Sequence, residues 1–247
     1  MNTKQMNQLL IIIPAYNEEA NIERVVENIR DHYPEYDYVV INDGSRDHTS
    51  EICHCHNYEI IDLPINLGLA GAFQTGMRYA DQKGYKYAIQ LDADGQHLPE
   101  YIAPMLQKME EGYDMVIASR FVTEKKPKTM RMLGSNLIAF AIRLTTGQKI
   151  SDPTSGMRLF NREMIREFAT NINYGPEPDT VSFLLKQGAR IGEVQVEMKE
   201  RVAGESYLNW AKSITYMLKM ILSILVIQNF RKRTVLDDKI KEGGKNK

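Results

Sequence analysis

The chain has 247 residues, enough for one large domain or for a domain with an appendage, and 43% of them are hydrophobic and 26% charged, as in globular proteins. Its 31 Lys and Arg nearly balance its 32 Asp and Glu, and a net charge of -1 argues against a nucleic-acid binder that relies on phosphate contacts. Residues 1–8 are polar and the apolar run after them is short, so we expect no signal peptide and a cytoplasmic protein.

Short apolar runs alternate with amphipathic stretches through the first half of the chain. We expect buried strands at residues 9–13, 38–41, 59–63, 87–91 and 115–118. Helices are expected between the first two strands and near 46–56, 70–83 and 99–111. This alternation predicts an α/β fold with a mostly parallel sheet that is flanked by helices, in which ligands bind beyond the carboxyl ends of the strands.

The second half is less regular. We expect helices at 131–146 and 179–187, a polar turn at 151–156 and a strand at 191–198. One continuous domain is expected over 1–206, followed by a helical extension at 207–233 and a disordered tail at 234–247. The only two cysteines stand in the string Cys53-His54-Cys55-His56, which is too tightly spaced for the usual zinc sites, so we interpret it as a helix end with incidental thiols.

Asp92 and Asp94 are the sharpest chemical signal in the sequence. They follow a predicted buried strand, and two carboxylates at this spacing can share a divalent cation with a bound diphosphate. Mg²⁺ or Mn²⁺ is the expected ion, because both prefer oxygen ligands, and it would neutralise charge on a departing diphosphate. The alternative is an ordinary acidic turn, which Asp and Gly also favour.

Three further residues support a polar site at the same edge. Asp43 ends the second strand and could accept hydrogen bonds from a base or ribose, or could cap the helix that follows. Gly68 lies in a glycine-bearing loop that could approach a nucleotide closely. Arg120 follows the fifth strand and could bind phosphate, or pair with a surface carboxylate.

Five strings in this order resemble family 2 glycosyltransferases of the GT-A fold, most closely the branch of dolichyl- and polyprenyl-phosphate sugar transferases. The strings are IIIPAYNEE (11–19), NDGSRDHT (42–49), NLGLAGAFQTGMRYA (66–80), LDADGQHLPE (91–100) and SDPTSGMRLF (151–160). The resemblance implies an inverting, metal-dependent enzyme that moves a sugar from a nucleotide-sugar, with UDP-sugars favoured, to a polyprenyl phosphate or a lipid-linked polysaccharide intermediate.

The resemblance also implies roles for single residues. The nucleotide pocket would be lined by Pro14, Tyr16, Glu18 and Asp43, and Gln96 would lie near the sugar. The catalytic acid of the family matches Asp179, with Glu177 close behind it, and geometry must decide between the two. A plain helix N-cap is the alternative for Asp179.

Arg158 and Arg201 are candidates for binding the donor diphosphate or an acceptor phosphate, because the planar guanidinium can make paired hydrogen bonds. Related transferases often have Gly-x-Ser followed by Lys in the segment after Arg201. Here Tyr207 occupies the lysine position, which weakens assignment of the polyprenyl-phosphate acceptor.

The C-terminal extension carries an apolar stripe at helical spacing but is too often interrupted to favour a membrane-spanning helix. We expect a helix at the inner face of the cell membrane, with Arg231-Lys232-Arg233 near anionic lipids, or a helix that packs on a second copy or on its own domain. Two rival functions remain: a nucleotidyltransferase, disfavoured because no glycine-rich, arginine-bearing loop follows the first strand, and a non-catalytic nucleotide-sugar-binding or scaffold protein of the same fold.

Overall fold

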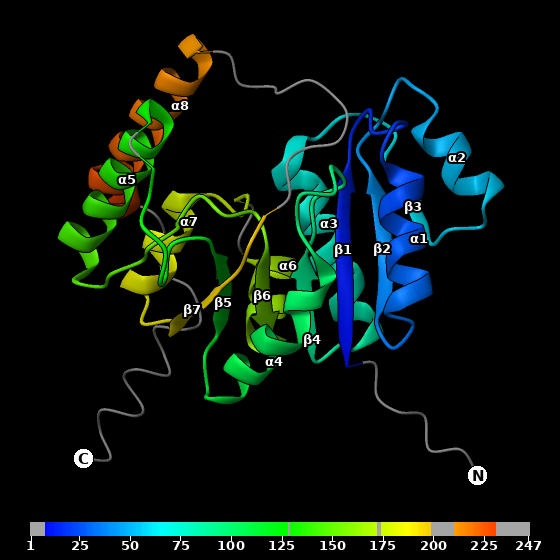
Figure 1. Ribbon diagram of the computed structural model, residues 1–247, viewed down its shortest axis with the longest axis horizontal. Helices are drawn as coiled ribbons and strands as arrows, with labels where there is room; N and C mark the ends of the chain where they lie inside the picture. The colour runs from blue at the N-terminus through cyan, green and yellow to red at the C-terminus, as the bar shows by residue number, and fades with distance from the viewer. Residues whose placement is uncertain (1–7, 128, 172–173, 199–209, 231–247) are drawn as a thin grey trace.

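The computed structural model describes residues 8–127, 129–171, 174–198 and 210–230. They form a seven-stranded sheet with helices on both faces (Figure 1), which confirms the predicted fold class. The strands are β1 (Leu9–Ala15), β2 (Asp37–Asn42), β3 (Ile60–Asp62), β4 (Tyr87–Gln90), β5 (Met115–Ser119), β6 (Arg158–Asn161) and β7 (Ile191–Gln195). The α-helices are α1 (Ile22–His32), α2 (Thr49–Cys55), α3 (Gly68–Lys83), α4 (Ile102–Glu110), α5 (Met130–Thr146), α6 (Arg162–Thr170), α7 (Pro178–Lys186) and α8 (Trp210–Leu225). Two short 3₁₀ helices, η1 (Pro99–Tyr101) and η2 (Ile227–Phe230), precede α4 and follow α8.

The strand order is β3-β2-β1-β4-β6-β5-β7. Strand β1 pairs in parallel with both β2 and β4, so the carboxyl ends of these three strands meet at one edge of the sheet. Strand β6 runs antiparallel to its neighbours β4 and β5. The polar residues that follow β1, β2 and β4 therefore lie at the same edge, as the sequence predicts.

Strand β6 and helix α6 are absent from the elements expected from the sequence. The four residues of β6 are too few to show a strand period, and their pairing depends on β4, where Gln90 lies opposite Arg158. Two element boundaries also differ from those expected from the sequence. The strand expected to reach residue 198 ends at Gln195, and the helix expected from residue 46 begins at Thr49.

Two apolar cores lie on opposite faces of the sheet. One contains the apolar side of α1, where Ile22, Val25, Val26 and Ile29 recur at helical spacing and are all buried. The other lies beneath α3, α6, α5, α7 and α8. Helix α3 packs closely on β1, since a Cβ at Gly76 would lie 2.3 Å from Ile12 Cγ2. Cys53 and Cys55 lie at the end of α2, as interpreted from the sequence.

Helices α5 and α8 lie side by side at one end of the molecule (Figure 1). Met220 and Ile224 of α8 enter the second core, so α8 packs on the same domain along its inner side. Large apolar side chains of both helices are also exposed to solvent, and we call them the apolar face; they are Leu133, Leu137, Phe140, Leu144, Leu218 and Leu222. Among the described residues, no helix combines the length and hydropathy needed to cross a bilayer.

Candidate active site

Asp43 lies directly beyond the carboxyl end of β2 and beside β1. Its backbone N–H donates to Ala15 O at 2.8 Å, and its buried Oδ1 accepts from the backbone N–H of Leu67 at 2.7 Å. Asp43 is therefore tied to the start of α3, where Gly68 has a φ of +74° that favours glycine. The N-cap residue of α2 is His48, and the backbone N–H of Thr49 donates to Asp47 Oδ1 at 3.0 Å, so Asp43 is not the cap of that helix.

The loop after β1 is held against the loop after β2. The backbone N–H of Glu18 donates to Thr49 Oγ1, and Glu18 Oε2 accepts from Asn21 Nδ2, both at 2.9 Å. Pro14, near the end of β1, and Tyr16, directly after the strand, are both half-buried. These contacts bring Pro14, Tyr16 and Glu18 to the edge at which Asp43 lies.

Asp92 and Asp94 occupy different environments within one turn. The Asp92 side chain is 36% exposed; its Oδ1 accepts from Gln90 Nε2 at 2.9 Å, and its Oδ2 lies 3.5 Å from His97 Nδ1. The Asp94 residue is only 6% exposed, and its Oδ1 accepts from the backbone N–H of Gln96 at 3.0 Å. Asp92 is thus the more accessible of the two carboxylates.

A glycine keeps space for the Asp92 carboxylate. A Cβ at Gly156 would lie 2.5 Å from Asp92 Oδ2, so the polar loop before β6 approaches the acidic turn as closely as a residue without a side chain allows.

The donor atoms at this edge suit a hard divalent cation that is shared with a substrate. Carboxylate oxygens are the ligands that Mg²⁺ and Mn²⁺ prefer. Within the described ranges, no group of three or more His, Cys, Asp and Glu side chains is placed to hold an ion without help. Diphosphate oxygens would therefore have to complete the coordination sphere around Asp92 and Asp94.

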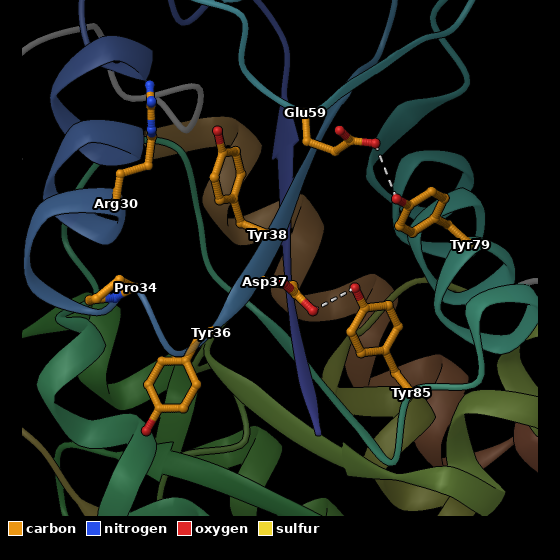
Figure 2. Close-up of a pocket in the computed structure, with 8 residues that line it drawn as sticks. All are labelled: Arg30, Pro34, Tyr36, Asp37, Tyr38, Glu59, Tyr79 and Tyr85. Atoms are coloured by element: carbon orange, nitrogen blue, oxygen red, sulfur yellow. Dashed lines mark hydrogen bonds between the residues drawn. The ribbon is translucent and has the colours of Figure 1, made fainter. Parts of the chain in front are cut away.

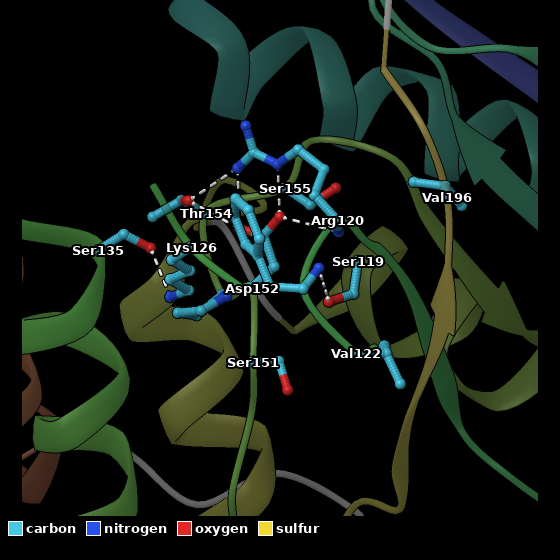
Figure 3. A network of polar contacts seen from close by, with 12 residues as sticks. Ser119, Arg120, Val122, Lys126, Ser135, Ser151, Asp152, Thr154, Ser155 and Val196 are labelled. Atoms are coloured by element: carbon cyan, nitrogen blue, oxygen red, sulfur yellow. Dashed lines mark hydrogen bonds and ion pairs between the residues drawn. The ribbon is translucent and has the colours of Figure 1, made fainter. Parts of the chain in front are cut away.

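Arg120 is engaged by a buried carboxylate (Figure 3). Its Nε and Nη2 donate to Asp152 Oδ2 and Oδ1 at 2.6 and 2.9 Å, a bidentate pair in which the Asp152 side chain is fully buried. Burial by itself would raise the pKa of Asp152, but the hydrogen bonds and charge of Arg120 outweigh it and lower that pKa. The partner is thus a buried carboxylate and not the surface one considered from the sequence.

A second cation lies beside this pair. Lys126 Nζ donates to Ser135 Oγ on α5 at 3.1 Å, and burial lowers the pKa of Lys126 while the Asp152 carboxylate opposes that change. Lys126 thus lies between the first turns of α5 and the Arg120–Asp152 pair (Figure 3).

Arg158 lies beneath the polar loop that precedes β6. It is 2% exposed, and it donates to the carbonyl oxygens of Ser155 at 2.9 Å, Pro153 at 2.9 Å and Glu177 at 3.4 Å. Burial lowers its pKa, and the Glu177 carboxylate acts in the opposite direction. A phosphate could reach this guanidinium only if the loop moved, so in this structure Arg158 supports the backbone of the site.

The two candidate acids point to different partners on helix α8 and η2. Tyr216 donates its hydroxyl to Glu177 Oε2, and burial together with the Glu177 carboxylate raises the pKa of Tyr216. Asp179 is 5% exposed, and its Oδ2 accepts from Ser223 Oγ at 2.6 Å and from Gln228 Nε2 at 3.1 Å. Helix α7 begins at Pro178 with Glu177 at its N-cap position, so Asp179 lies in the first turn and not at the cap.

Several residues of this site were not singled out from the sequence. Gln90 and His97 flank Asp92, and a signal for them existed, since both lie within five residues of it. Tyr216, Ser223 and Gln228 had no local signal, because they lie 39 to 49 residues from their partners. Arg201 and Tyr207 fall outside the described residues.

A separate hollow of about 430 Å³ lies at the amino end of β2, away from the carboxyl edge (Figure 2). Tyr85 and Tyr79 line it, and their hydroxyls donate to Asp37 Oδ2 at 2.9 Å and to Glu59 Oε1 at 3.1 Å. These tyrosine–carboxylate pairs are comparable in chemistry to the Tyr216–Glu177 pair but are remote from the acidic turn.

Comparisons with known proteins agree with the geometry. The chain is 30% identical over 214 residues to undecaprenyl-phosphate mannosyltransferase of Micrococcus luteus, covering 82% of this chain and 88% of that one. It is also 30% identical over 214 residues to UDP-N-acetylglucosamine–dolichyl-phosphate N-acetylglucosaminyltransferase of Methanococcus voltae, covering 76% and 84%.

A solved structure has the same fold. The glucosyl-3-phosphoglycerate synthase of Mycobacterium tuberculosis, crystallised with phosphoglyceric acid, superposes with a TM-score of 0.63 at 18% identity, covering 90% of this chain and 80% of that one. The model of "Glycosyl transferase family 2" matches residues 10–168. This range includes Asp43, the acidic turn with Asp92 and Asp94, and Arg158 of β6. The chain therefore belongs to glycosyl transferase family 2, and it is an enzyme of that family.

Proposed function

We propose that the protein is an inverting, divalent-metal-dependent glycosyltransferase that moves a sugar from a UDP-sugar to a polyprenyl phosphate or to a lipid-linked polysaccharide intermediate. The observation that carries the proposal is the gathering of Asp43, Gly68, Asp92 and Asp94 at one edge of the sheet, which we call the donor edge. Inversion follows if the acceptor displaces the nucleoside diphosphate directly, in a single step.

At the donor edge, each residue has a proposed task. Asp43 accepts hydrogen bonds from the nucleoside, with Pro14, Tyr16 and Glu18 lining the same pocket. Asp92 and Asp94 hold Mg²⁺ or Mn²⁺, which, when bound, stabilises the negative charge on the leaving diphosphate. Gln96 lies two residues beyond Asp94 and faces the sugar in this proposal.

Two comparisons support the donor and the ion. The Methanococcus voltae relative is named as an enzyme that uses UDP-N-acetylglucosamine. The Mycobacterium tuberculosis synthase was also crystallised with Mn²⁺ and UDP, and that structure superposes with a TM-score of 0.60. A nucleotide and a divalent ion are thus compatible with this fold.

The acceptor class is supported by the surroundings of α5. Lys126 bonds to Ser135 near its amino end and lies beside the Arg120–Asp152 pair, and α5 also carries Phe140 and Leu144, which are 63% and 67% exposed. Cationic groups beside an apolar surface suit a molecule that joins a phosphate to a hydrocarbon chain. The curated relatives are named for undecaprenyl-phosphate and dolichyl-phosphate acceptors.

The same surface supports peripheral attachment to a membrane. The apolar face combines residues from α5 and α8, and helices that bind in the membrane interface bury such a face at the boundary between headgroups and acyl chains. We therefore propose that the protein works at the inner face of the cell membrane.

The test is a transfer assay with the purified chain, labelled UDP-sugars or GDP-sugars, and undecaprenyl or dolichyl phosphate in vesicles. We expect Mn²⁺- or Mg²⁺-dependent formation of a lipid-linked sugar of inverted anomeric configuration. Transfer that persists unchanged in excess chelator would contradict the metal assignment, and absence of any lipid-linked product would contradict the acceptor class.

A further inference from the structure

Helix α8 reaches both candidate acids of the transferase site. Tyr216 donates to Glu177, and Ser223 of α8 donates to Asp179, with Gln228 of η2 reaching the same carboxylate oxygen. A helix that only attached the chain to a membrane or to a second copy would have no need to bond these two side chains.

The two acids differ in their burial and in their other contacts. Asp179 is 5% exposed and its Oδ2 receives two hydrogen bonds in the interface with α8, so it anchors that helix. Glu177 is half-buried, and its backbone carbonyl oxygen accepts a hydrogen bond from Arg158. Arg158 also supports the loop that contains Gly156, which lies against the Asp92 carboxylate. Through these contacts Glu177 is connected to the acidic turn.

The loop that carries Glu177 also reaches the glycine-bearing start of α3. A Cβ at Gly175 would lie 3.4 Å from Ala70 Cβ, two residues beyond Gly68. Thr180 Oγ1 donates to the Gly175 carbonyl at 2.8 Å and so fixes the loop on α7. Glu177 therefore lies between the donor edge and α8.

The residues next to Tyr216 on α8 are tightly packed. Its neighbour Met217 packs against Gly134 of α5, where a Cβ would lie 1.5 Å from Met217 Sδ. Met220, one turn further on, is buried in the core. Tyr216 is thus held in place independently of its bond to Glu177.

We propose that Tyr216 is a positioning residue of the transferase: it holds the Glu177 carboxylate toward the reacting groups, while Asp179 fixes α8 so that Tyr216 is in reach. The proposal rests on the proposed function and assigns the acid of the site to Glu177 instead of Asp179. The Tyr216 hydroxyl occupies Oε2, which leaves Oε1 to meet the acceptor.

In the transfer step one bond forms and one breaks. The acceptor oxygen forms a bond to the anomeric carbon, and the bond from that carbon to the nucleoside diphosphate breaks, with the electron pair leaving on the diphosphate. A hydroxyl or water acceptor gives its proton to Glu177. A phosphate acceptor is already ionised, and Glu177 then only orients it.

The experiment compares Y216F, E177Q, D179N and the Y216F/E177Q double variant of the full chain. Transfer from the nucleotide-sugar that the unmodified chain uses is measured to a short polyprenyl phosphate in detergent, so that membrane attachment does not enter. Hydrolysis of the same nucleotide-sugar by water is measured in parallel. The matched control is Y85F, which removes the same kind of hydroxyl from a carboxylate, Asp37, at the opposite end of the sheet.

We expect Y216F to lower kcat about tenfold and E177Q about a hundredfold in the hydrolysis assay, while nucleotide affinity in calorimetry stays within about twofold. The double variant should be no slower than E177Q, because Tyr216 acts through Glu177. Y85F should keep kcat within about twofold even though it lowers the unfolding temperature.

Equal losses of kcat in Y216F and Y85F would reduce Tyr216 to a stabilising residue and overturn the proposal. It would also be overturned if D179N abolished turnover while E177Q retained it, since Asp179 would then be the acid. If the unmodified chain hydrolyses the nucleotide-sugar but transfers to no polyprenyl phosphate, the acceptor class of the proposed function has failed, and the hydrolysis series still decides the role of Tyr216.

Discussion

The donor edge and the helical layer of α5, α7 and α8 are built in different ways. At the donor edge, each polar residue follows its strand directly, and the sheet brings the strand ends together through the register of β1 with β2 and β4. In the helical layer, Glu177 and Asp179 depend on partners 39 to 49 residues away on α8 and η2. Short sequence motifs therefore predict the part of the enzyme that we propose to bind the nucleotide, whereas the surroundings of the proposed acid are specified by packing.

Arg120 holds the polar loop that precedes β6 through Asp152, and its loss should have the largest effect. R120A leaves the buried Asp152 carboxylate without its bidentate partner, and we expect a loss of about 3–5 kcal/mol in the free energy of unfolding. Urea unfolding monitored by circular dichroism measures it. A loss below about 1 kcal/mol would mean that water replaces Arg120 as the partner of Asp152.

Substitutions of the acidic turn should affect the donor edge alone. We expect D92N and D94N each to lower transfer about 10²- to 10³-fold and to remove the gain in UDP affinity that Mn²⁺ gives, because the ion loses a carboxylate. Calorimetric titration of UDP with and without Mn²⁺ measures the second effect. The unfolding temperature should change little for D92N, whose side chain is 36% exposed; metal-dependent binding that survives in both variants would refute the assignment.

The Arg120–Asp152 pair should also make stability depend on pH. The pKa of Asp152 is lowered in the folded chain, so its pairing stabilises the fold above the ordinary Asp value, and this contribution is lost as the pH falls through the folded pKa. The difference in unfolding free energy between the wild type and D152N, about 1–3 kcal/mol at pH 7, should shrink below about pH 4. Urea unfolding from pH 7 to pH 3 tests this, and a difference that is independent of pH would contradict it.

The apolar face should matter only at a membrane. We expect F140S/L144S to bind vesicles that contain anionic lipid about tenfold more weakly, because both side chains are exposed and would be buried in the interface. Turnover with a short acceptor in detergent should be retained. The control is I65S, which removes an equally exposed side chain outside the apolar face. Equal vesicle binding by F140S/L144S and I65S would point away from this surface.

The sequence predicted the parts of the fold that repeat a local pattern. The strands that became β1, β2, β4 and β5 and the buried side of α1 needed only hydrophobic periodicity. Strand β6 could not be found in this way, because its four residues are buried by pairing with β4 and β5 and not by a period of their own.

The same contrast holds within the site. Asp43, Asp92 and Asp94 stand at strand ends, and the structure brings them to one edge as expected. Arg158 reads as a phosphate ligand from its motif, yet its guanidinium is buried against three carbonyl oxygens, a fact that depends on how the loop folds over β6. The partner of Glu177 could not be inferred, because nothing near Tyr216 in the sequence marks it as more than one residue of an apolar helix.

The position of β6 in the sheet also bears on the order in which the chain can fold during synthesis. Among the described strands, β1 to β4 pair only with one another and with β6, whereas both neighbours of β5, β6 and β7, come later in the chain. A nascent chain that ends before residue 158 can thus assemble the donor edge but carries β5 without a partner and leaves one side of β4 open. Unpaired strand edges promote aggregation, so the interval before β6 leaves the ribosome is the stage at which we expect this protein to need a chaperone most.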